Sequence, residues 1–301
     1  MNYKAGYVGL IGFPNSGKST LVNALVGEKV SIISSKPQTT RQRVLGMTSG
    51  DQFQVVFVDA PGIVKASSGL NHFLQTEREE VLEDADILLA MLNIDEDKKQ
   101  NLMDVIKICQ DSGKPFIVVI SKNDFVKKHR VQMLRDELST LDVPIVSVSA
   151  KNSPADTREI LMPLILERLP QAPGPFFDPS LYTTQTVREM SAEIIREQCF
   201  VFLHQEIPFG LAVEINKFDE SRNDLTCIYS TVVLSKKNHQ PIVVGKGGQS
   251  LKRIGQSARM KLESLLGHKV YLDIHVKVKP NWMKNKTQMK EFGYVSPAKS
   301  Q

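Results

Sequence analysis

Short apolar runs alternate with amphipathic stretches through the first half of the chain. Five runs of strand type are bounded by polar, Gly or Pro residues: 7–11, 53–58, 86–92, 116–120 and 144–148. Apolar positions recur with helical spacing over 19–26, 98–110 and 156–169. Such alternation predicts an α/β fold, with a doubly wound, mostly parallel sheet, helices on both faces and a ligand at the carboxyl ends of the strands.

The pattern changes after residue 169. Four prolines within 170–179 end the preceding helix and indicate a boundary, so we expect a domain over 1–170, a proline-rich linker over 171–182 and a second domain over 183–301. An amphipathic helix is predicted over 184–204, followed by strands over 211–215 and 227–234. A hairpin at 236–239, an apolar run at 241–244, a further helix and a strand at 270–278 complete a predicted α+β domain.

Composition narrows the class of protein. The chain has 301 residues, 41% of them apolar and 24% charged, which suits a globular protein of about two domains. No apolar run approaches the ~18 residues of a membrane span, and the N-terminus lacks the apolar core of a signal peptide, so we expect a cytoplasmic protein. Cys109, Cys199 and Cys227 have neither metal-ligand nor redox spacing and are interpreted as reduced core thiols.

Charge is distributed unevenly between the two halves. Residues 1–178 carry 20 Lys/Arg and 22 Asp/Glu, whereas residues 179–301 carry 18 and 11. Within 236–290 the counts are 13 and 2. A basic second half indicates a polyanionic partner, with nucleic acid ahead of an anionic membrane surface, although a solvated basic face without a ligand has the same composition.

The first apolar run leads into a complete match to G-x-x-x-x-G-K-S/T. The strand before it and the helix after it are the context that a phosphate-binding loop requires, although an ordinary Gly-rich turn is the alternative. Backbone N–H groups at the start of the helix favour an anion, Lys18 is placed to reach the β/γ-phosphates, and the Ser19 hydroxyl is a ligand for Mg²⁺. The eight residues are Gly12, Phe13, Pro14, Asn15, Ser16, Gly17, Lys18 and Ser19.

Two later segments have the position of nucleotide-sensing switches. The polar stretch 34–43 offers Thr40, or alternatively Thr39, as a Mg²⁺ ligand when a γ-phosphate is present. The strand 53–58 ends in Asp59, Ala60, Pro61 and Gly62, where Asp59 supplies a carboxylate on the Mg²⁺ side and Gly62 a backbone N–H for the γ-phosphate. The segment 63–71 is predicted to be a second, mobile switch. The catalytic candidates are therefore Lys18, Thr40 and Gly62.

Two further motifs select the base. Ser121, Lys122, Asn123 and Asp124 follow one strand, and Ser149, Ala150 and Lys151 follow the next. The carboxylate of Asp124 can accept hydrogen bonds from N1–H and the exocyclic amine of guanine, whereas adenine has no such donor pair on that edge. The sequence therefore favours guanine. A surface ion pair between Lys122 and Asp124 is the alternative.

The second domain contains a G-x-x-G turn that opens a basic helix. Glycines there allow backbone N–H groups to approach a nucleic-acid backbone, as in KH domains, although such a turn is often only a tight turn. The candidate RNA-binding residues are Gly245, Lys246, Gly247, Gly248, Lys252 and Arg253. Trp282 and Tyr271 are able to stack on bases but are interpreted as core residues.

These motifs together resemble those of a GTPase of the Era family. Segments 12–19, 39–40, 59–62, 121–124 and 149–151 stand at its five nucleotide motifs, and 277–279, Trp282 and 293–295 are similar to the end of its KH domain. Over residues 5–296, the resemblance implies a P-loop NTPase domain followed by a type II KH domain. It also implies a GTPase that uses Mg²⁺, binds 16S ribosomal RNA near its 3′ end and helps to mature the small ribosomal subunit. We expect the protein to be a monomer. Peripheral association with the cell membrane is a further implication.

Two residues depart from the commonest GTPase pattern. Ser121 stands where the family has an Asn that braces the phosphate loop and faces guanine, so we expect weaker nucleotide binding with the choice of guanine kept. Ile63 stands where many GTPases have a Gln that orients water, so we expect slow hydrolysis of GTP by this protein alone. Asn15 is similar to an Asn that holds K⁺ in GTPases with an apolar residue at that position, which implies a K⁺ requirement.

Three readings of function compete at this point. The first is a guanine-nucleotide switch that controls RNA binding by the KH domain. The second is an ATP-dependent enzyme, which Asp124 and 149–151 disfavour. The third is an RNA-binding scaffold with a weakened nucleotide site, suggested by Ser121 and Ile63.

Overall fold

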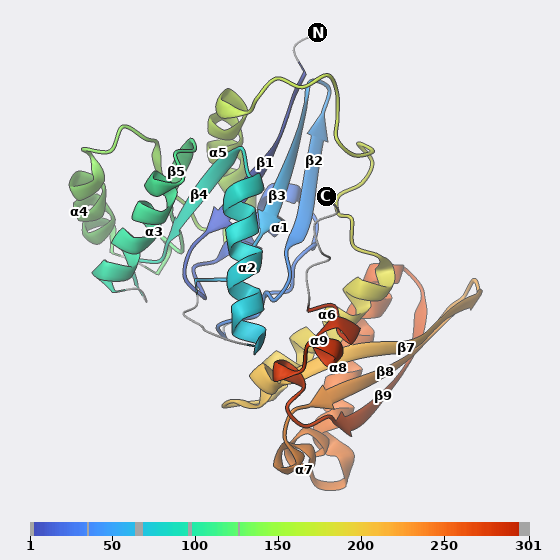
Figure 1. Cartoon of the computed structure of the whole chain (residues 1–301). Coiled ribbons are helices and arrows are strands. Elements are labelled where there is room, and N and C mark those ends of the chain that lie inside the picture. Colours follow the sequence, from blue (N-terminus) through green and yellow to red (C-terminus); the bar gives the residue numbers. More distant parts are fainter. Residues whose placement is uncertain (1–2, 35, 64–68, 96–97, 126, 295–301) are drawn as a thin grey trace. The chain divides into compact units, whose positions relative to one another are not determined.

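A computed structural model describes residues 3–34, 36–63, 69–95, 98–125 and 127–294 (Figure 1). The chain divides into two units, one made of Met1–Ala66 and Leu74–Thr184 and the other of Ser67–Phe73 and Gln185–Gln301. Each unit has its own sheet and its own buried core. Of the segment 63–71 that was predicted as a switch, residues 64–68 lie outside the described part of the chain, and residues 69–71 begin a helix.

The first unit is built on a six-stranded sheet in the order β2-β3-β1-β4-β5-β6. Every pairing is parallel except that of β2 with β3. Strands β4 and β5 are buried at every position, as expected where helices cover both faces of a parallel sheet. The strands are β1 (Lys4–Ile11), β2 (Val44–Gly50), β3 (Phe53–Asp59), β4 (Ile87–Leu92), β5 (Phe116–Ile120) and β6 (Ile145–Ser147).

Helices cover both faces of this sheet (Figure 1). On one face, α1 (Lys18–Val26) and α5 (Pro154–Arg168) enclose a core with β-strand side chains. On the other face the core is closed by α2 (Gly69–Asp84), α3 (Lys99–Asp111) and α4 (Lys128–Leu138). The predicted doubly wound fold is therefore confirmed. The sequence analysis did not predict β2, α2 or α4.

Residues 171–182, which were predicted to form a linker, lie against the sheet of the first unit. The Oε1 atom of the fully buried Gln54 side chain accepts hydrogen bonds from the backbone N–H groups of Phe176 and Phe177, at 2.7 and 2.9 Å. The Nε2 atom of Gln54 donates to the Phe177 carbonyl at 2.9 Å. Further along, the Met47 N–H donates to the Tyr182 carbonyl at 2.8 Å. This proline-rich segment is thus fastened to β3 and β2.

The second unit packs helices on a three-stranded sheet in the order β7-β8-β9. Strands β7 and β8 are antiparallel, whereas β8 and β9 are parallel and joined by α7 and α8. Its elements are α6 (Val187–Phe202), β7 (Leu211–Arg222), β8 (Leu225–Leu234), α7 (Gln240–Val244), α8 (Gln249–Leu266), β9 (Lys269–Val278) and α9 (Lys286–Glu291). Short 3-10 turns occupy Ile207–Gly210, Lys237–His239, Lys246–Gly248 and Trp282–Lys284.

The predicted hairpin at 236–239 is wrong. The structure has a 3-10 turn there, followed directly by α7, which has Pro241 in its first turn and Val243 fully buried. Proline suits the first turn of a helix, because the N–H that it lacks has no intrahelical partner there. The apolar run at 241–244 thus forms a helix that leads into the G-x-x-G turn.

Helix α6 begins later than predicted because Thr186 caps it. The Thr186 hydroxyl accepts a hydrogen bond from the Glu189 N–H at 3.2 Å, and the Glu189 carboxylate accepts from the Thr186 N–H at 2.8 Å. This reciprocal capping box satisfies two backbone donors at the helix start. The helix therefore starts at Val187, not at residue 184.

The aromatic residues of the second unit differ in exposure. Trp282 is fully buried, donates from Nε1 to the Gly210 carbonyl at 3.2 Å and stacks on Tyr294 with ring centroids 5.6 Å apart, so its predicted core role is confirmed. The prediction for Tyr271 is wrong, because this side chain is 50% exposed. Successive residues of a strand face opposite sides of the sheet, and Val270, not Tyr271, points into the core.

The cysteines are free thiols, as predicted. Cys109 and Cys199 are buried, and burial raises the pKa of each thiol to about 12. Cys227 is only half-buried, so its assignment to the core holds in part. No helix within the described ranges is both long and apolar enough to cross a membrane.

Candidate functional site

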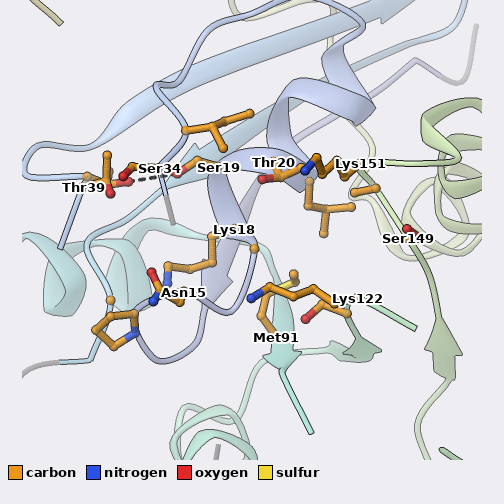
Figure 2. A pocket seen from close by; sticks show the side chains of 18 of the residues that line it. Asn15, Lys18, Ser19, Thr20, Ser34, Thr39, Met91, Lys122, Ser149 and Lys151 are labelled. Atoms are coloured by element: carbon orange, nitrogen blue, oxygen red, sulfur yellow. Dashed lines mark hydrogen bonds between the residues drawn. The ribbon is translucent and has the colours of Figure 1, made fainter. Parts of the chain in front are cut away.

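A cavity of about 450 Å³ opens in the first unit, beside the carboxyl ends of β1, β3, β5 and β6. Figure 2 shows Asn15 and Lys18 toward its left side and Lys122, Ser149 and Lys151 toward its right. Four of the five predicted nucleotide motifs contribute two or more residues to its lining. The motif at 59–62 contributes Gly62. The predicted residues that line the cavity are Pro14, Asn15, Gly17, Lys18, Ser19, Thr39, Thr40, Gly62, Ser121, Lys122, Asp124, Ser149, Ala150 and Lys151.

The other predicted residues support this lining. Ser16, Asp59 and Ala60 are fully buried beside it. Phe13 and Ile63 pack against the core between the sheet and helices α2, α3 and α4. The backbone N–H of Asn123 donates to the Val148 carbonyl at 3.3 Å and so joins the two base-selecting motifs.

The phosphate loop has the geometry of an anion site. Gly17, the residue before α1, has a φ of 89°, and no side chain caps the helix, so the first backbone N–H groups of α1 have no side-chain acceptor there. The Lys18 ammonium lies over the loop and donates to the carbonyls of Gly12 and Phe13 at 3.1 and 2.9 Å. Gly12 has no room for a side chain, because a Cβ would lie 2.8 Å from the Met91 carbonyl oxygen.

Three oxygen-bearing side chains converge beside Lys18. The hydroxyls of Ser19 and Thr40 are 2.9 Å apart, and the Thr40 hydroxyl donates to Asp59 Oδ2 at 3.3 Å. Thr39 is turned elsewhere and donates to the Lys36 carbonyl at 2.8 Å. Of the two threonines considered from the sequence, Thr40 is the one that the structure brings to Ser19 and Asp59.

Asp59 has the environment of a cation ligand. Burial raises its pKa, and hydrogen bonding to Ser19 and the charge of Lys18 oppose that rise only in part. Its Oδ1 atom is buried and has no hydrogen-bond partner among the described residues. Since Mg²⁺ prefers oxygen ligands and a cation offsets the cost of a buried carboxylate, Ser19, Thr40 and Asp59 fit Mg²⁺. A bound cation favours the ionised carboxylate of Asp59, so the affinity of the site for Mg²⁺ should rise with pH.

Gly62 lies directly against the phosphate loop. A Cβ on Gly62 would be 2.6 Å from the Pro14 nitrogen, so only glycine allows this approach. The next N–H, that of Ile63, donates to the Gly12 carbonyl at 3.1 Å. The Ile63 side chain packs on the apolar core, and it has no group with which to hold a water molecule.

The base-selecting end is centred on Asp124. Its Oδ1 accepts from the Ser149 hydroxyl at 2.6 Å and its Oδ2 from Asn152 Nδ2 at 2.7 Å. Each carboxylate oxygen keeps a further lone pair for a donor in the cavity. Lys122 has a φ of 54°, a left-handed conformation that non-glycine residues adopt mainly where the surrounding structure imposes it, as at functional sites.

Sequence reasoning missed Asn152 and Phe125. Asn152 orients Asp124 from 28 positions away, a contact with no local signature. Phe125 lines the cavity although its side chain is 67% exposed, and its place next to Asp124 was the available signal.

The G-x-x-G turn of the second unit has a left-handed backbone that requires glycine, and Lys246 and Gly247 at its centre are exposed. Gly245, Gly247 and Gly248 have φ values of 75°, 58° and 78°. A Cβ on Gly245 would lie 2.7 Å from that of Ser250, whereas the space around Gly247 and Gly248 is open. Lys246, Lys252 and Arg253 are exposed on the turn and the first turns of α8. Backbone and basic side chains thus face solvent together, which suits the backbone of a nucleic acid.

Comparisons with known proteins agree with this geometry. Residues 7–122 match the family described as 50S ribosome-binding GTPase, and residues 206–283 match the KH domain family. The fold and its cavity thus define a P-loop GTPase joined to a KH domain. GTPase Era of Thermoanaerobacter sp. (strain X514) is 37% identical over 100% of this chain and 99% of its own length. The chain belongs to the GTPase Era family, as the sequence motifs predicted.

Other relatives and solved structures are similar over almost the whole chain. GTPase Era of Syntrophus aciditrophicus (strain SB) is 35% identical over 97% of this chain and 95% of its own length. A crystal structure of Era from Aquifex aeolicus bound to GDP and AlF₄⁻ covers 97% of this chain and all of its own, with 35% identity and a TM-score of 0.89. A structure of Era with MgGDPNP and nucleotides 1506–1542 of 16S ribosomal RNA covers 98% and 100%, with the same identity and TM-score.

Proposed function

We propose that this GTPase uses its nucleotide state to control binding of its KH domain to 16S ribosomal RNA near the 3′ end, during maturation of the small ribosomal subunit. The main support is that one chain carries both the guanine-type cavity and the exposed G-x-x-G turn. The similar Era that was solved with MgGDPNP and a fragment of 16S ribosomal RNA adds to this support.

RNA affinity in two nucleotide states tests the proposal. We expect the affinity for an oligonucleotide spanning the 3′ end of 16S ribosomal RNA to differ between protein bound to a nonhydrolysable GTP analogue and protein bound to GDP. Fluorescence anisotropy at stated salt measures both, because the phosphate contribution depends on ionic strength. Equal affinities would contradict a nucleotide switch.

The proposed nucleotide chemistry assigns a role to each group at the phosphate end. Ser19, Thr40 and Asp59 would hold Mg²⁺, and the ion would supply positive charge beside the β- and γ-phosphates. Lys18 and the N–H groups of the loop stabilise charge that develops on the phosphoryl oxygens, while Thr40 and Gly62 position the γ-phosphate and the attacking water. Loss of the γ-phosphate removes a partner from Thr40 and Gly62 and relaxes the segments that carry them.

We further propose that K⁺ supports hydrolysis through Asn15, which lines the cavity. A cation there adds positive charge beside the phosphates, which the apolar side chain of Ile63 does not supply. Turnover should be about tenfold or more faster in K⁺ than in Na⁺ buffer. Asn15→Gly keeps the left-handed backbone (φ 64°), removes the carboxamide and should abolish the difference. Equal wild-type turnover in both salts would refute the K⁺ site.

The proposed RNA clamp is tested at Gly247, where the open space admits a side chain. Gly247→Asp should weaken RNA binding by about tenfold, because it sets a negative charge against the phosphates. Gly247→Asn is the matched control, since Asn has nearly the same shape and tolerates a positive φ equally well. It should bind RNA much more tightly than the Asp variant in the same anisotropy assay. Equal affinities of the two variants would argue against an RNA backbone at this turn.

The remaining proposals concern the setting of the protein. We propose a monomer that works in the cytoplasm, with peripheral contact at the inner face of the cell membrane as a secondary association. The similarity to Era GTPases over the full chain supports the cytoplasmic location.

A further inference from the structure

Asn93, the residue directly after β4, touches the phosphate loop from an adjacent strand. Its side chain is 1% exposed, and its Nδ2 atom donates to the Asn15 carbonyl at 3.3 Å. Its Oδ1 atom accepts from the Asp95 N–H, also at 3.3 Å, in the local turn typical of Asn. The Arg130 guanidinium donates to the Ile94 carbonyl at 2.6 Å and so fastens this turn from α4.

Ser121 makes no such contact with the loop. Its backbone N–H and its hydroxyl both donate to the Leu92 carbonyl, at 2.9 and 3.2 Å. Its hydroxyl oxygen would lie 4.0 Å from a Cβ built on Gly17, so Ser121 adjoins the loop without bonding to it. Segment 121–124 is therefore hydrogen-bonded to Leu92, the last residue of β4. Asn93, the residue after Leu92, is hydrogen-bonded to the phosphate loop.

Asn93 contacts the phosphate loop at Asn15, a residue with an unfavourable backbone conformation. Asn15 has a φ of 64°, a conformation that non-glycine residues adopt at a cost. The peptide group that follows it is held at both ends, because the Ser16 N–H donates to the Phe13 carbonyl at 3.2 Å and the Asn15 carbonyl accepts from Asn93. A peptide plane held at both ends fixes the direction of the N–H groups that follow it into α1.

We propose that Asn93 is a positioning residue that braces the phosphate loop and takes over the bracing that Ser121 is too short to provide. The inference rests on the proposed nucleotide site. Asn93 acts through Asn15, and its carboxamide is outside the cavity lining. Asn at position 121 would both brace the loop and face guanine, whereas Asn93 does only the first, so the two positions should be energetically coupled.

The test is a double-mutant cycle of Asn93→Ser and Ser121→Asn in the full chain. A Ser at 93 keeps an acceptor for the Asp95 N–H but cannot reach the Asn15 carbonyl. Titration with fluorescent GDP and GTP analogues, with release rates, should give about tenfold weaker binding and faster release for Asn93→Ser. Ser121→Asn should improve affinity about threefold in the wild type and about tenfold or more in the Asn93→Ser background, and this excess measures the coupling.

Two results would overturn the proposal. The first is a nucleotide affinity of Asn93→Ser within twofold of the wild type. The second is an equal gain in affinity from Ser121→Asn in the wild type and in Asn93→Ser. Equal gains would mean that the two positions are not coupled. Melting curves of the nucleotide-free variants check folding, and Asn93→Thr, which retains the same acceptor, replaces a Ser variant that does not fold. Lys18→Ala keeps the two proposals apart. If Lys18→Ala binds nucleotide as tightly as the wild type, the proposed nucleotide site is wrong. If Lys18→Ala loses nucleotide affinity while Asn93→Ser keeps it, only the proposed role of Asn93 is refuted.

Discussion

Lys18→Ala should lower GTP affinity and single-turnover hydrolysis by about 100-fold or more, because the ammonium is the one side-chain cation of the phosphate loop and is the group that we propose for the β- and γ-phosphates. The ammonium also donates to the carbonyls of Gly12 and Phe13, so its loss removes charge and part of the loop's internal bonding together. Both effects weaken phosphate binding. Hydrolysis is measured with radiolabelled GTP and excess protein, and affinity with a fluorescent GDP analogue.

The control for this substitution is Lys107→Ala, at an exposed lysine on α3 of the same unit. It should hydrolyse GTP like the wild type. RNA binding by Lys18→Ala in the absence of nucleotide checks that the second unit is folded. Hydrolysis by Lys18→Ala within tenfold of the wild-type rate would mean that catalysis does not take place in this cavity.

Asp124→Asn should exchange guanine for xanthine. In the proposed base site the carboxylate would accept from two donors of guanine, whereas Asn presents one acceptor and one donor, which match N1–H and the 2-oxo group of xanthine. GTP affinity should fall by about 100-fold or more and XTP affinity should rise above it, since an unpaired buried donor or acceptor costs as much as the lost bonds. Competition of GTP, XTP and ATP against a fluorescent nucleotide measures the order of preference.

Asn152→Ala is the matched control for the base site. It leaves the carboxylate in place and removes only the amide that donates to Asp124 Oδ2 at 2.7 Å. Affinity for GTP should fall by less than about tenfold, and the preference for guanine should be unchanged. An unaltered preference in Asp124→Asn itself would exclude this residue as the base selector, and displacement of GDP by ATP in the wild type would favour an ATP-dependent enzyme.

The phosphate loop could be predicted from the sequence because its parts are contiguous. A strand, eight loop residues and a helix start are enough to bring Gly12, Lys18 and Ser19 to one anion site, and their order is visible in the chain. Asp59 and Asp124 could be predicted as site residues for a related reason. Each comes at or just after the carboxyl end of a buried strand, and parallel strands bring those ends to one edge.

Contacts between distant segments were beyond the sequence pattern. Asn93 and Asn152 follow no periodicity, and their partners at Asn15 and Asp124 lie 78 and 28 positions away. Secondary structure was missed for a different reason. Strand β2 contains two glycines and two hydroxyl residues in seven positions, too few apolar side chains to be recognised, and becomes a strand through pairing with β3. Tertiary pairing decided these cases, not local preference.

The fastening of the proline-rich segment shortens the last of the connections between the two units. Thr183 bridges to Gly46 on β2, and Thr186 already belongs to the cap of α6, so only Thr184 and Gln185 separate a residue fixed to the first sheet from the start of α6. At about 3.5 Å per extended residue, such a hinge spans roughly 10 Å from Thr183 to Thr186. Along this connection, any change in the direction of the chain falls on the dihedral angles of two residues, and lengthening it with Gly-Ser pairs would test whether RNA binding depends on so short a link.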